Sequence, residues 1–376
     1  MIRELREIIP KIIGYRLYRL GLFRPGSPFN LTFSVTHHCQ SKCRTCHIWQ
    51  IYRRHPEKVQ TELTLWEIEK IFKSMGHIYI FNISGGEPFL RTDLVEIVDA
   101  ACKHLSPGII HIPTNAVSPP LVLKKTSAII DILKTRYPDT RLTIKPSLDQ
   151  IGEEHDVIRG VKGNFKKVIQ VFDGLKALKP RYKHLDVELG TVISKWNVHD
   201  IKAISEFVMK LQPDSYRNEI AEQRSEMFNT SHTIAPNPDD YKKAVGFFVS
   251  QTEKHMKNRG SFQKITHAFR RVYYDLAIRI LDEQRKVIPC YAGISNAHMT
   301  PDGDIWACCT LGYDHPMGNL RDHGYNFHQL WKSRQAESVR QHIKAKNCAC
   351  PMANQMYANI LMAPLPFIRV LMKIIC

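Results

Sequence analysis

The hydrophobic and polar positions along the chain follow two alternating periods, which predicts a repeated order of strand and helix. Apolar residues at every second position, or short apolar runs, are typical of strands. Such stretches cover residues 31–36, 78–83, 109–113, 141–148, 185–193 and 214–220. Between them the apolar residues recur with the helical period near 3.6. These helical stretches cover residues 68–76, 93–105, 121–135, 165–178 and 199–211.

About six β–α units of this kind predict a parallel sheet, open or curled into part of a barrel. The first of the predicted helices is preceded by a capping box, Thr64 and Glu67, and ends at Gly76. Ligands of such sheets bind at the carboxyl ends of the strands. The residues that follow each predicted strand are therefore the candidates for the functional site.

The second half of the chain changes character. Residues 231–285 are polar and mainly helical in pattern, whereas residues 286–355 are rich in glycine, aromatic residues and cysteine. The sequence therefore predicts an amphipathic N-terminal segment, a partial barrel, a helical linker, a small loop-rich unit and an apolar basic tail. The predicted bounds of these parts are residues 1–29, 30–230, 231–285, 286–355 and 356–376.

The composition of the 376 residues, with 43% hydrophobic and 24% charged residues, is that of a globular protein. Lys and Arg (53) exceed Asp and Glu (36), which gives a formal net charge of +17. This excess favours an acidic partner, which is nucleic acid, an anionic lipid surface or a phosphorylated substrate. The alternative is a basic composition without a specific partner. No aromatic-rich basic stripe is visible, so nucleic acid is the weakest of these partners.

Ten cysteines are many for a chain whose first residues carry frequent charges and lack the apolar core of a signal peptide. No charge-free apolar run reaches the ~18 residues of a membrane span. The sequence therefore predicts a cytoplasmic protein in which clustered cysteines bind metal. Cys102, inside a predicted helix, and Cys376, at the end of the sequence, lie outside the clusters and are expected to be incidental.

Three cysteines directly follow the first predicted strand. Cys39, Cys43 and Cys46 have the spacing C-x3-C-x2-C, which lets three thiolates surround one metal centre. A [4Fe–4S] cluster held by three cysteines leaves one iron open for a small ligand. The alternative is a zinc site, for which His37 or His47 would have to supply the fourth ligand.

This triplet resembles that of the radical S-adenosylmethionine (SAM) superfamily, and the resemblance runs from about residue 30 to about residue 350. It implies an α/β fold, a partial (β/α)6 TIM-like barrel with a small C-terminal iron–sulfur extension. It also implies a [4Fe–4S] cluster whose open iron binds SAM. An electron from that cluster cleaves SAM to a 5′-deoxyadenosyl radical. A reductant protein of flavodoxin or ferredoxin type is the implied electron donor.

Motifs after the next strands agree with the resemblance. Residues 84–88 (SGGEP) are similar to the family's turn that grips the amino group of SAM, and glycine lets a backbone approach a ligand closely. Asn115 ends the third strand and Ser147 the fourth, and Arg159 lies in a segment similar to one that approaches the ribose and carboxylate of SAM. The alternative for Arg159 is a surface position. The implied SAM contacts are Ser84, Gly85, Gly86, Glu87, Asn115, Ser147 and Arg159.

Five more cysteines cluster between residues 290 and 350, and Cys308 completes a G-x4-C pattern after a hairpin-like turn at 301–303. This region resembles the SPASM and twitch extensions, which bind auxiliary iron–sulfur clusters. Five cysteines are too few for two clusters, so the resemblance implies one auxiliary [4Fe–4S] cluster. Its implied ligands are Cys290, Cys308, Cys348 and Cys350, with Cys309 as an alternative to one of them. A zinc knuckle is the other interpretation.

Both ends of the chain combine apolar and basic residues. Apolar residues between positions 2 and 20 can share one helix face, and the tail carries Arg369 and Lys373 among apolar residues. Basic amphipathic ends suit an anionic membrane surface, so a peripheral position at the inner face of the membrane is expected. The alternative is that both ends pack on the barrel or on a partner chain.

These features predict an enzyme that cleaves SAM reductively and abstracts a hydrogen atom from an unactivated carbon. The apolar basic ends favour a lipid or isoprenoid-like, membrane-associated substrate. The resemblance to SPASM-type enzymes supports the alternative of peptide or protein maturation. The non-enzyme alternative is an inactive iron–sulfur or zinc interaction protein. The intact motif at 84–88, Asn115 and Arg159 argue against it.

Overall fold

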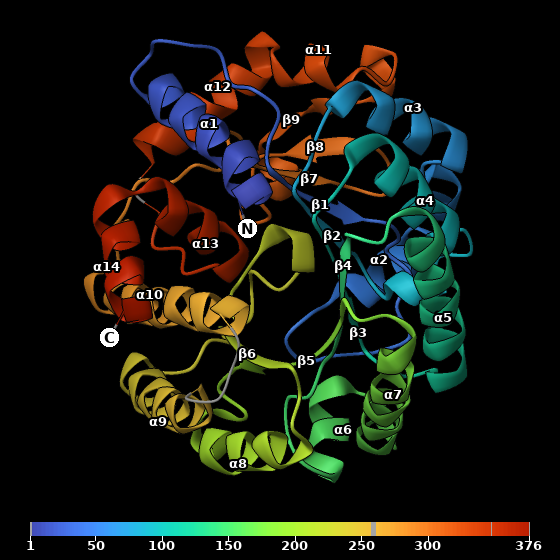
Figure 1. Ribbon diagram of the computed structural model, residues 1–376, viewed down its shortest axis with the longest axis vertical. Coiled ribbons are helices and arrows are strands. Elements are labelled where there is room, and N and C mark those ends of the chain that lie inside the picture. Colours follow the sequence, from blue (N-terminus) through green and yellow to red (C-terminus); the bar gives the residue numbers. More distant parts are fainter. Residues whose placement is uncertain (1, 257–260, 347, 376) are drawn as a thin grey trace.

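A computed structural model describes residues 2–256, 261–346 and 348–375, and Cys376 lies outside these ranges. Its centre is a nine-stranded sheet in the order β6-β5-β4-β3-β2-β1-β7-β8-β9, which curls without closing (Figure 1). The first six strands pair in parallel with their neighbours. They are β1 (Asn30–Ser34), β2 (Ile80–Ser84), β3 (Ile109–Thr114), β4 (Arg141–Pro146), β5 (Leu185–Ile193) and β6 (Ser215–Ile220). The predicted partial barrel is confirmed.

Helices cover the outer face of the sheet, as Figure 1 shows. They are α3 (Leu65–Met75), α4 (Leu94–Leu105), α5 (Pro119–Arg136), α6 (Glu153–Arg159), α7 (Asn164–Leu178) and α8 (Ile201–Leu211), with the short α2 (Ile51–Arg54) before them. The predicted capping box is present, because Glu67 N donates to Thr64 Oγ1 at 3.3 Å and Thr64 N donates to Glu67 Oε2 at 2.8 Å. This pairing fixes where α3 begins after the cysteine-bearing loop.

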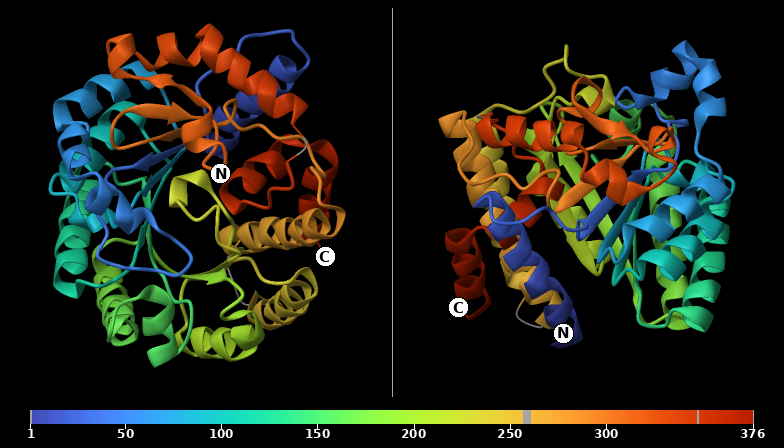
Figure 2. Two further views of the ribbon diagram at one scale, coloured as in Figure 1. Left: turned by 180° about the vertical axis from the view of Figure 1, so that it is seen from behind. Right: turned by 90° about the horizontal axis from the view of Figure 1, so that it is seen from above.

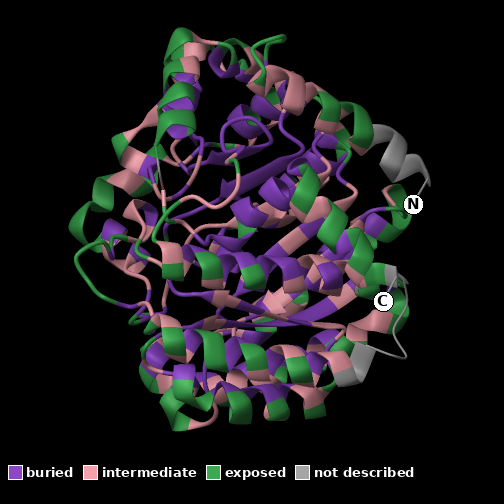
Figure 3. Cartoon of the chain, turned by 90° about the vertical axis from the view of Figure 1, so that its left-hand side faces the viewer, coloured by how far each residue is buried: buried purple, intermediate pink, exposed green. Residues whose placement is uncertain are grey.

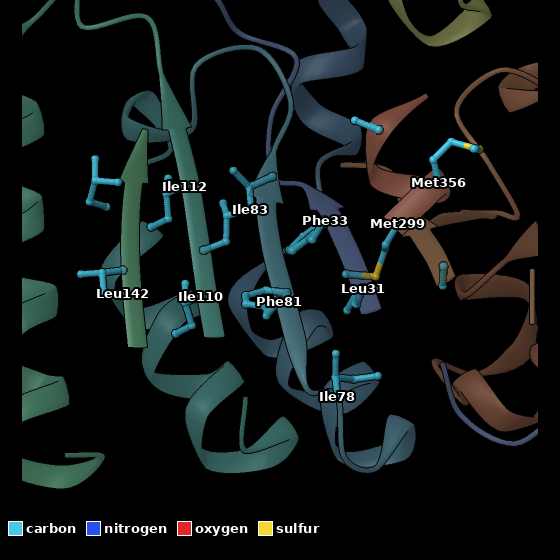
Figure 4. Packing of buried hydrophobic residues seen from close by; sticks show 14 of the residues in the cluster. Leu31, Phe33, Ile78, Phe81, Ile83, Ile110, Ile112, Leu142, Met299 and Met356 are labelled. Atoms are coloured by element: carbon cyan, nitrogen blue, oxygen red, sulfur yellow. The ribbon is translucent and has the colours of Figure 1, made fainter. Parts of the chain in front are cut away.

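The core lies between the sheet and the outer helices. Figure 4 shows apolar side chains of β1 to β4 in one layer, among them Phe33, Phe81, Ile110 and Leu142, all fully buried. Burial alternates along β3 and β4, so every second residue faces the barrel interior instead. Each fully buried side chain of this kind contributes about 1.5–3 kcal/mol. Figure 3 shows the same division, with buried residues in the strands and on the inner faces of the helices.

The C-terminal unit extends the barrel sheet. β7 (Asn296–Met299) pairs in parallel with β1, and β8 (Asp304–Trp306) and β9 (Pro316–Asn319) continue it as antiparallel strands. The predicted hairpin at residues 301–303 joins β7 to β8. Two helices, α11 (Phe327–Trp331) and α12 (Arg334–Ala345), follow these strands. Cys308 and Cys309 lie just after β8, in the same sheet whose strand β1 precedes the first cysteine group.

The segment 231–285, expected to be a linker, covers the β6 side of the barrel. It forms α9 (Pro238–Met256) and α10 (Ser261–Glu283). Arg270 Nη1 donates to the carbonyl of Tyr216 at 2.8 Å, and Tyr274 Oη donates to the carbonyl of Asn218 at 3.2 Å. These bonds attach α10 to β6, so the two helices are part of the barrel wall.

The terminal helices lie on one side of the molecule, next to each other (Figure 2). They are α1 (Ile2–Arg19), α13 (Ala353–Met362) and α14 (Pro364–Ile375). Arg16 Nε of α1 donates to the carbonyl of Met362 at 2.8 Å. In the described ranges no single helix is long and apolar enough to cross a membrane. Together α13 and α14 reach that length, but they bend by 94° where they meet.

Candidate functional site

The loop after β1 carries the cysteine triplet to the carboxyl ends of the strands. Cys39, Cys43 and Cys46 line one cavity of about 210 Å3 there. Burial, with the neighbouring Cys43 thiolate, raises the pKa of Cys39 to about 12, and the pKa of Cys46 is raised for the same reasons. Three thiols that resist ionisation need a cation beside them to become thiolates. The donor set therefore fits a positively charged metal centre.

Three neighbouring segments hold the backbone of this cysteine loop. Gly86 N donates to Thr36 O, and Glu87 N donates to His38 O, each at 2.8 Å. The other side of the loop is hydrogen-bonded to the end of α6, where Lys42 N donates to Arg159 O at 3.1 Å. The loop after β6 provides the third support.

That third support comes from Asn229, whose Nδ2 donates to the carbonyl of Thr45 at 2.8 Å. One residue past the last cysteine, His47 N donates to Met227 O at 2.9 Å. The backbone of the cysteine loop is thus held by hydrogen bonds from the residues after β2, from the end of α6 and from the loop after β6.

The two glycines of the SGGEP turn are needed for this contact. A Cβ on Gly85 would lie 2.2 Å from the carbonyl oxygen of Thr36, and one on Gly86 would lie 2.3 Å from that of His38. Gly85 also has φ +118°, which favours glycine. The sequence correctly indicated that the backbone of these glycines lies close to another group. In the structure that group is the backbone of the cysteine loop.

Glu87 places a carboxylate in the cavity wall. It is buried and accepts hydrogen bonds from Asn115 N at 2.6 Å and Thr114 Oγ1 at 3.0 Å. Burial nevertheless raises its pKa to about 7, so a cationic group in the cavity would favour the ionised form. Asn115 Nδ2 lies 3.6 Å from Cys39 Sγ, which joins the end of β3 to the cysteine loop.

Arg159 places a cation on the same cavity. Its Nη1 donates to Asp149 Oδ2 at 3.0 Å, and the thiolate of Cys43 helps to keep its pKa raised despite burial. Among the described residues the buried Nε of Arg159 has no hydrogen-bond partner. Ser147 also lines the cavity. Ser84 does not line it, although the next residue, Gly85, does. The structure therefore brings together all of the predicted SAM contacts except Ser84.

Sequence reasoning missed the residues at the end of β6. Glu219, Glu222 and Arg224 line the same cavity, and Arg224 Nε lies 3.2 Å from Glu222 Oε2. Burial raises the pKa of Glu222 to about 7 even beside this cation. A signal was present, because the charged run EIAEQR at 219–224 follows a predicted strand at its carboxyl end.

Four of the later cysteines form a second group beside the barrel. Burial, with the thiolates of Cys290 and Cys348, raises the pKa of Cys308 to about 12. Burial, the carboxylate of Glu222 and the thiolate of Cys308 raise the pKa of Cys350. Glu222 lines the first cavity, so the two cysteine groups are close neighbours. Cysteines are typical ligands of an iron–sulfur cluster or of a zinc ion.

The remaining cysteines point elsewhere. Cys102 is buried within α4. Cys309 is also buried, and its Sγ lies 2.9 Å from His298 Nδ1.

Comparison with known proteins gives two family matches. The radical SAM superfamily matches residues 33–208, and an iron–sulfur cluster-binding domain, SPASM, matches residues 290–351. The antilisterial bacteriocin subtilosin biosynthesis protein AlbA of Bacillus subtilis is 24% identical over 356 residues, which covers 89% of this chain and 69% of AlbA. The mycofactocin maturase MftC of Mycobacterium tuberculosis is 24% identical and covers 82% of this chain and 71% of MftC.

A solved structure shares the fold. Streptococcus suis SuiB bound to S-adenosylmethionine superposes with a TM-score of 0.57 at 15% identity, covering 86% of this chain and 70% of SuiB. The similarity supports the partial-barrel architecture with its C-terminal extension.

The glycine contact gives a direct test of the loop. Gly86→Ala places a methyl group against His38 O, so the cysteine loop must shift, and iron on the first cysteine group should be lost. Total iron after anaerobic reconstitution should fall by about half, from two four-iron clusters to one. Gly246→Ala in α9, where a Cβ meets nothing within 4 Å, is the matched control and should retain all of it. Unchanged iron in Gly86→Ala would show that the loop does not depend on this contact.

Proposed function

The chain belongs to the radical SAM superfamily and carries an SPASM domain, so it is an enzyme that uses a [4Fe–4S] cluster, SAM and auxiliary iron–sulfur. From this premise we propose that it is a peptide maturase. It abstracts hydrogen from an unactivated carbon of a peptide substrate after reductive cleavage of SAM.

The proposal rests on how much of the chain matches two relatives whose names refer to peptide products. AlbA and MftC, whose names give bacteriocin biosynthesis and mycofactocin maturation, match across both the barrel and the cysteine-rich unit. The sequence favoured a lipid or isoprenoid-like substrate because of the apolar basic ends. The relatives support the peptide alternative instead.

Charged side chains line part of the barrel interior, and this part suits the polar groups of a peptide. Inward-facing residues form ion pairs across it, with Lys145 Nζ 3.5 Å from Glu219 Oε1 and Arg217 Nε 2.9 Å from Glu188 Oε1. Arg270 Nη2 lies 3.3 Å from the other oxygen of Glu188. Covering such charges with hydrocarbon would remove their remaining hydration without new hydrogen bonds. A peptide supplies amide donors and acceptors that can pair with these groups.

We assign the first cluster to Cys39, Cys43 and Cys46. When bound there, it supplies the electron that cleaves SAM to a 5′-deoxyadenosyl radical. The chain's own residues bind and orient SAM. Glu87 accepts from the ammonium group of SAM, and Arg159 pairs with its carboxylate.

The remaining assignments concern the ribose and the second cysteine group. Asn115 and Ser147, at the ends of adjacent strands, lie where the ribose would contact the cavity wall. We assign the auxiliary cluster to Cys290, Cys308, Cys348 and Cys350. The net charge of +17 suits an acidic flavodoxin- or ferredoxin-type reductant.

The function is tested with peptides encoded by short reading frames beside its gene. Each synthetic peptide is incubated anaerobically with reconstituted enzyme, SAM and dithionite, and both 5′-deoxyadenosine and peptide mass are measured. One peptide should raise the rate of 5′-deoxyadenosine formation about tenfold or more. The mass of that peptide should fall by the hydrogen that is removed, since substrate binding couples SAM cleavage to hydrogen abstraction. The Cys39→Ala, Cys43→Ala, Cys46→Ala triple variant is the control and should form neither product. Cleavage that persists in this variant contradicts the cluster assignment, and failure of every peptide contradicts the substrate class.

We further propose that α14 rests on an anionic membrane surface. One face packs on the protein, because Val370 is fully buried and the ring of Phe367 lies 6.4 Å from that of Phe269. The opposite face exposes Leu365 (75%) and Ile368 (50%), next to Arg369. A partly packed helix with an apolar outer face and basic flanks suits reversible interfacial binding.

The membrane proposal is tested with vesicles that contain anionic lipid. Wild-type protein should sediment with them at low salt and be released as salt rises, because charges are screened over about 10 Å at 0.1 M. Replacing Leu365, Ile368 and Leu371 with Ser should reduce binding about tenfold or more, as exposed apolar area is lost. Val59→Ser, an equally exposed apolar position on another surface, should bind like wild type. No wild-type binding at any salt concentration would contradict the proposal.

A further inference from the structure

A third group of metal-binding side chains lies outside both cysteine groups. Glu226, His298 and Cys309 are all buried, and one donor atom of each lies within 4.8 Å of the others. They come from three separate segments: the turn after β6, strand β7, and the residues that follow β8. We propose that these three side chains bind one Zn2+ ion, at a site distinct from the iron–sulfur clusters.

The distances fit a tetrahedral ion with a small adjustment. His298 Nδ1 lies 2.9 Å from Cys309 Sγ, and the donor atoms of all three side chains lie within 4.8 Å of one another, so the imidazole and the thiol would move slightly apart around an ion. Ligand atoms of a tetrahedral zinc are roughly 3.3–3.8 Å apart, given bond lengths of about 2.0–2.3 Å. Thiolate, imidazole and carboxylate are the three side-chain ligands that zinc prefers.

The other nitrogen of His298 is already positioned as in a metal ligand. Its Nε2 lies 2.8 Å from Ser34 Oγ at the end of β1. Histidines that bind metal donate their second N–H to an oxygen, which fixes the tautomer. Ser34 therefore leaves Nδ1, the nitrogen nearest the thiol, free to bind the ion.

Charge favours an ion as well. The carboxylate of Glu226 is buried, and the neighbouring guanidinium of Arg224 pairs with Glu222 at 3.2 Å. A buried carboxylate beside a thiol is costly unless a cation compensates it. A Zn2+ ion at this position would place a cation beside the buried side chain of Glu226.

A buried histidine offers a fourth ligand. His37 follows three residues after Ser34 on the same segment and is buried, with 6% of its surface exposed. Among the described residues its Nδ1 has no hydrogen-bond partner. His37 is not one of the side chains whose donor atoms lie within 4.8 Å of one another, so it would have to move toward the ion to complete a tetrahedral zinc.

The site joins the supports of the two cysteine groups. Ser225 Oγ, next to Glu226, donates to Cys309 O at 3.4 Å, and Cys309 directly follows Cys308. On the other side, Met227 accepts from the backbone of His47, next to Cys46. An ion at this position would fix the distance between the two iron–sulfur sites.

The proposal is tested on the anaerobically reconstituted holoenzyme, prepared with added Zn2+. Its metal content is measured, and its zinc-edge X-ray absorption spectrum is recorded. Zinc-edge spectra are not affected by the iron of the clusters. The wild type should contain about one zinc per chain, with a single sulfur at about 2.3 Å and nitrogen or oxygen at about 2.0–2.2 Å. Cys309→Ser and His298→Gln should lower the zinc content at least tenfold, while Cys102→Ser, a buried thiol in α4, should keep it.

A milder variant covers the case in which those replacements fail to fold. Ser34→Ala removes only the hydroxyl beside His298 and should weaken zinc affinity about 10–100-fold in competition with a chelator. Wild type without stoichiometric zinc would overturn the proposal. So would a shell of four sulfurs, which places zinc on the auxiliary cysteines, or unchanged affinity in Ser34→Ala.

Discussion

Main-chain packing between the cysteine loop and the SGGEP turn is the contact on which the candidate site depends. Two successive glycines let the carbonyl groups of Thr36 and His38 approach to distances at which no side chain fits. The hydrogen bonds formed there fix the loop over the ends of the strands. With the loop fixed, Cys39 reaches Asn115 and Glu87 faces the same cavity.

Burial then determines the chemistry of these groups. Thiols and carboxylates that share a desolvated cavity resist ionisation, as the raised pKa values of Cys39 and Glu87 show. A metal cluster and a cationic ligand supply the positive charge that such an interior lacks. The group of Glu226, His298 and Cys309 is likewise buried, and its donor atoms lie within 4.8 Å of one another.

Much of this arrangement could be predicted from the sequence, because parallel strands bring their carboxyl ends to one edge. That rule placed Cys39, Glu87, Asn115 and Ser147 together without any knowledge of the structure. It did not identify Glu222, since a charged run after a strand also occurs on ordinary surfaces. The pairing of β7 with β1 joins segments far apart in the chain, so no local sequence pattern indicates that Glu226, His298 and Cys309 would meet.

The central claim is that two cysteine groups hold two separate clusters, of which only the first binds SAM. Electron paramagnetic resonance of the dithionite-reduced enzyme, recorded with and without SAM, tests it most directly. Two cluster signals should be present in the wild type. The Cys39→Ala, Cys43→Ala, Cys46→Ala triple variant should lack one of them. SAM should shift that signal in the wild type and leave the other signal unchanged. A single signal, or a SAM-dependent shift that survives in this variant, would contradict the claim.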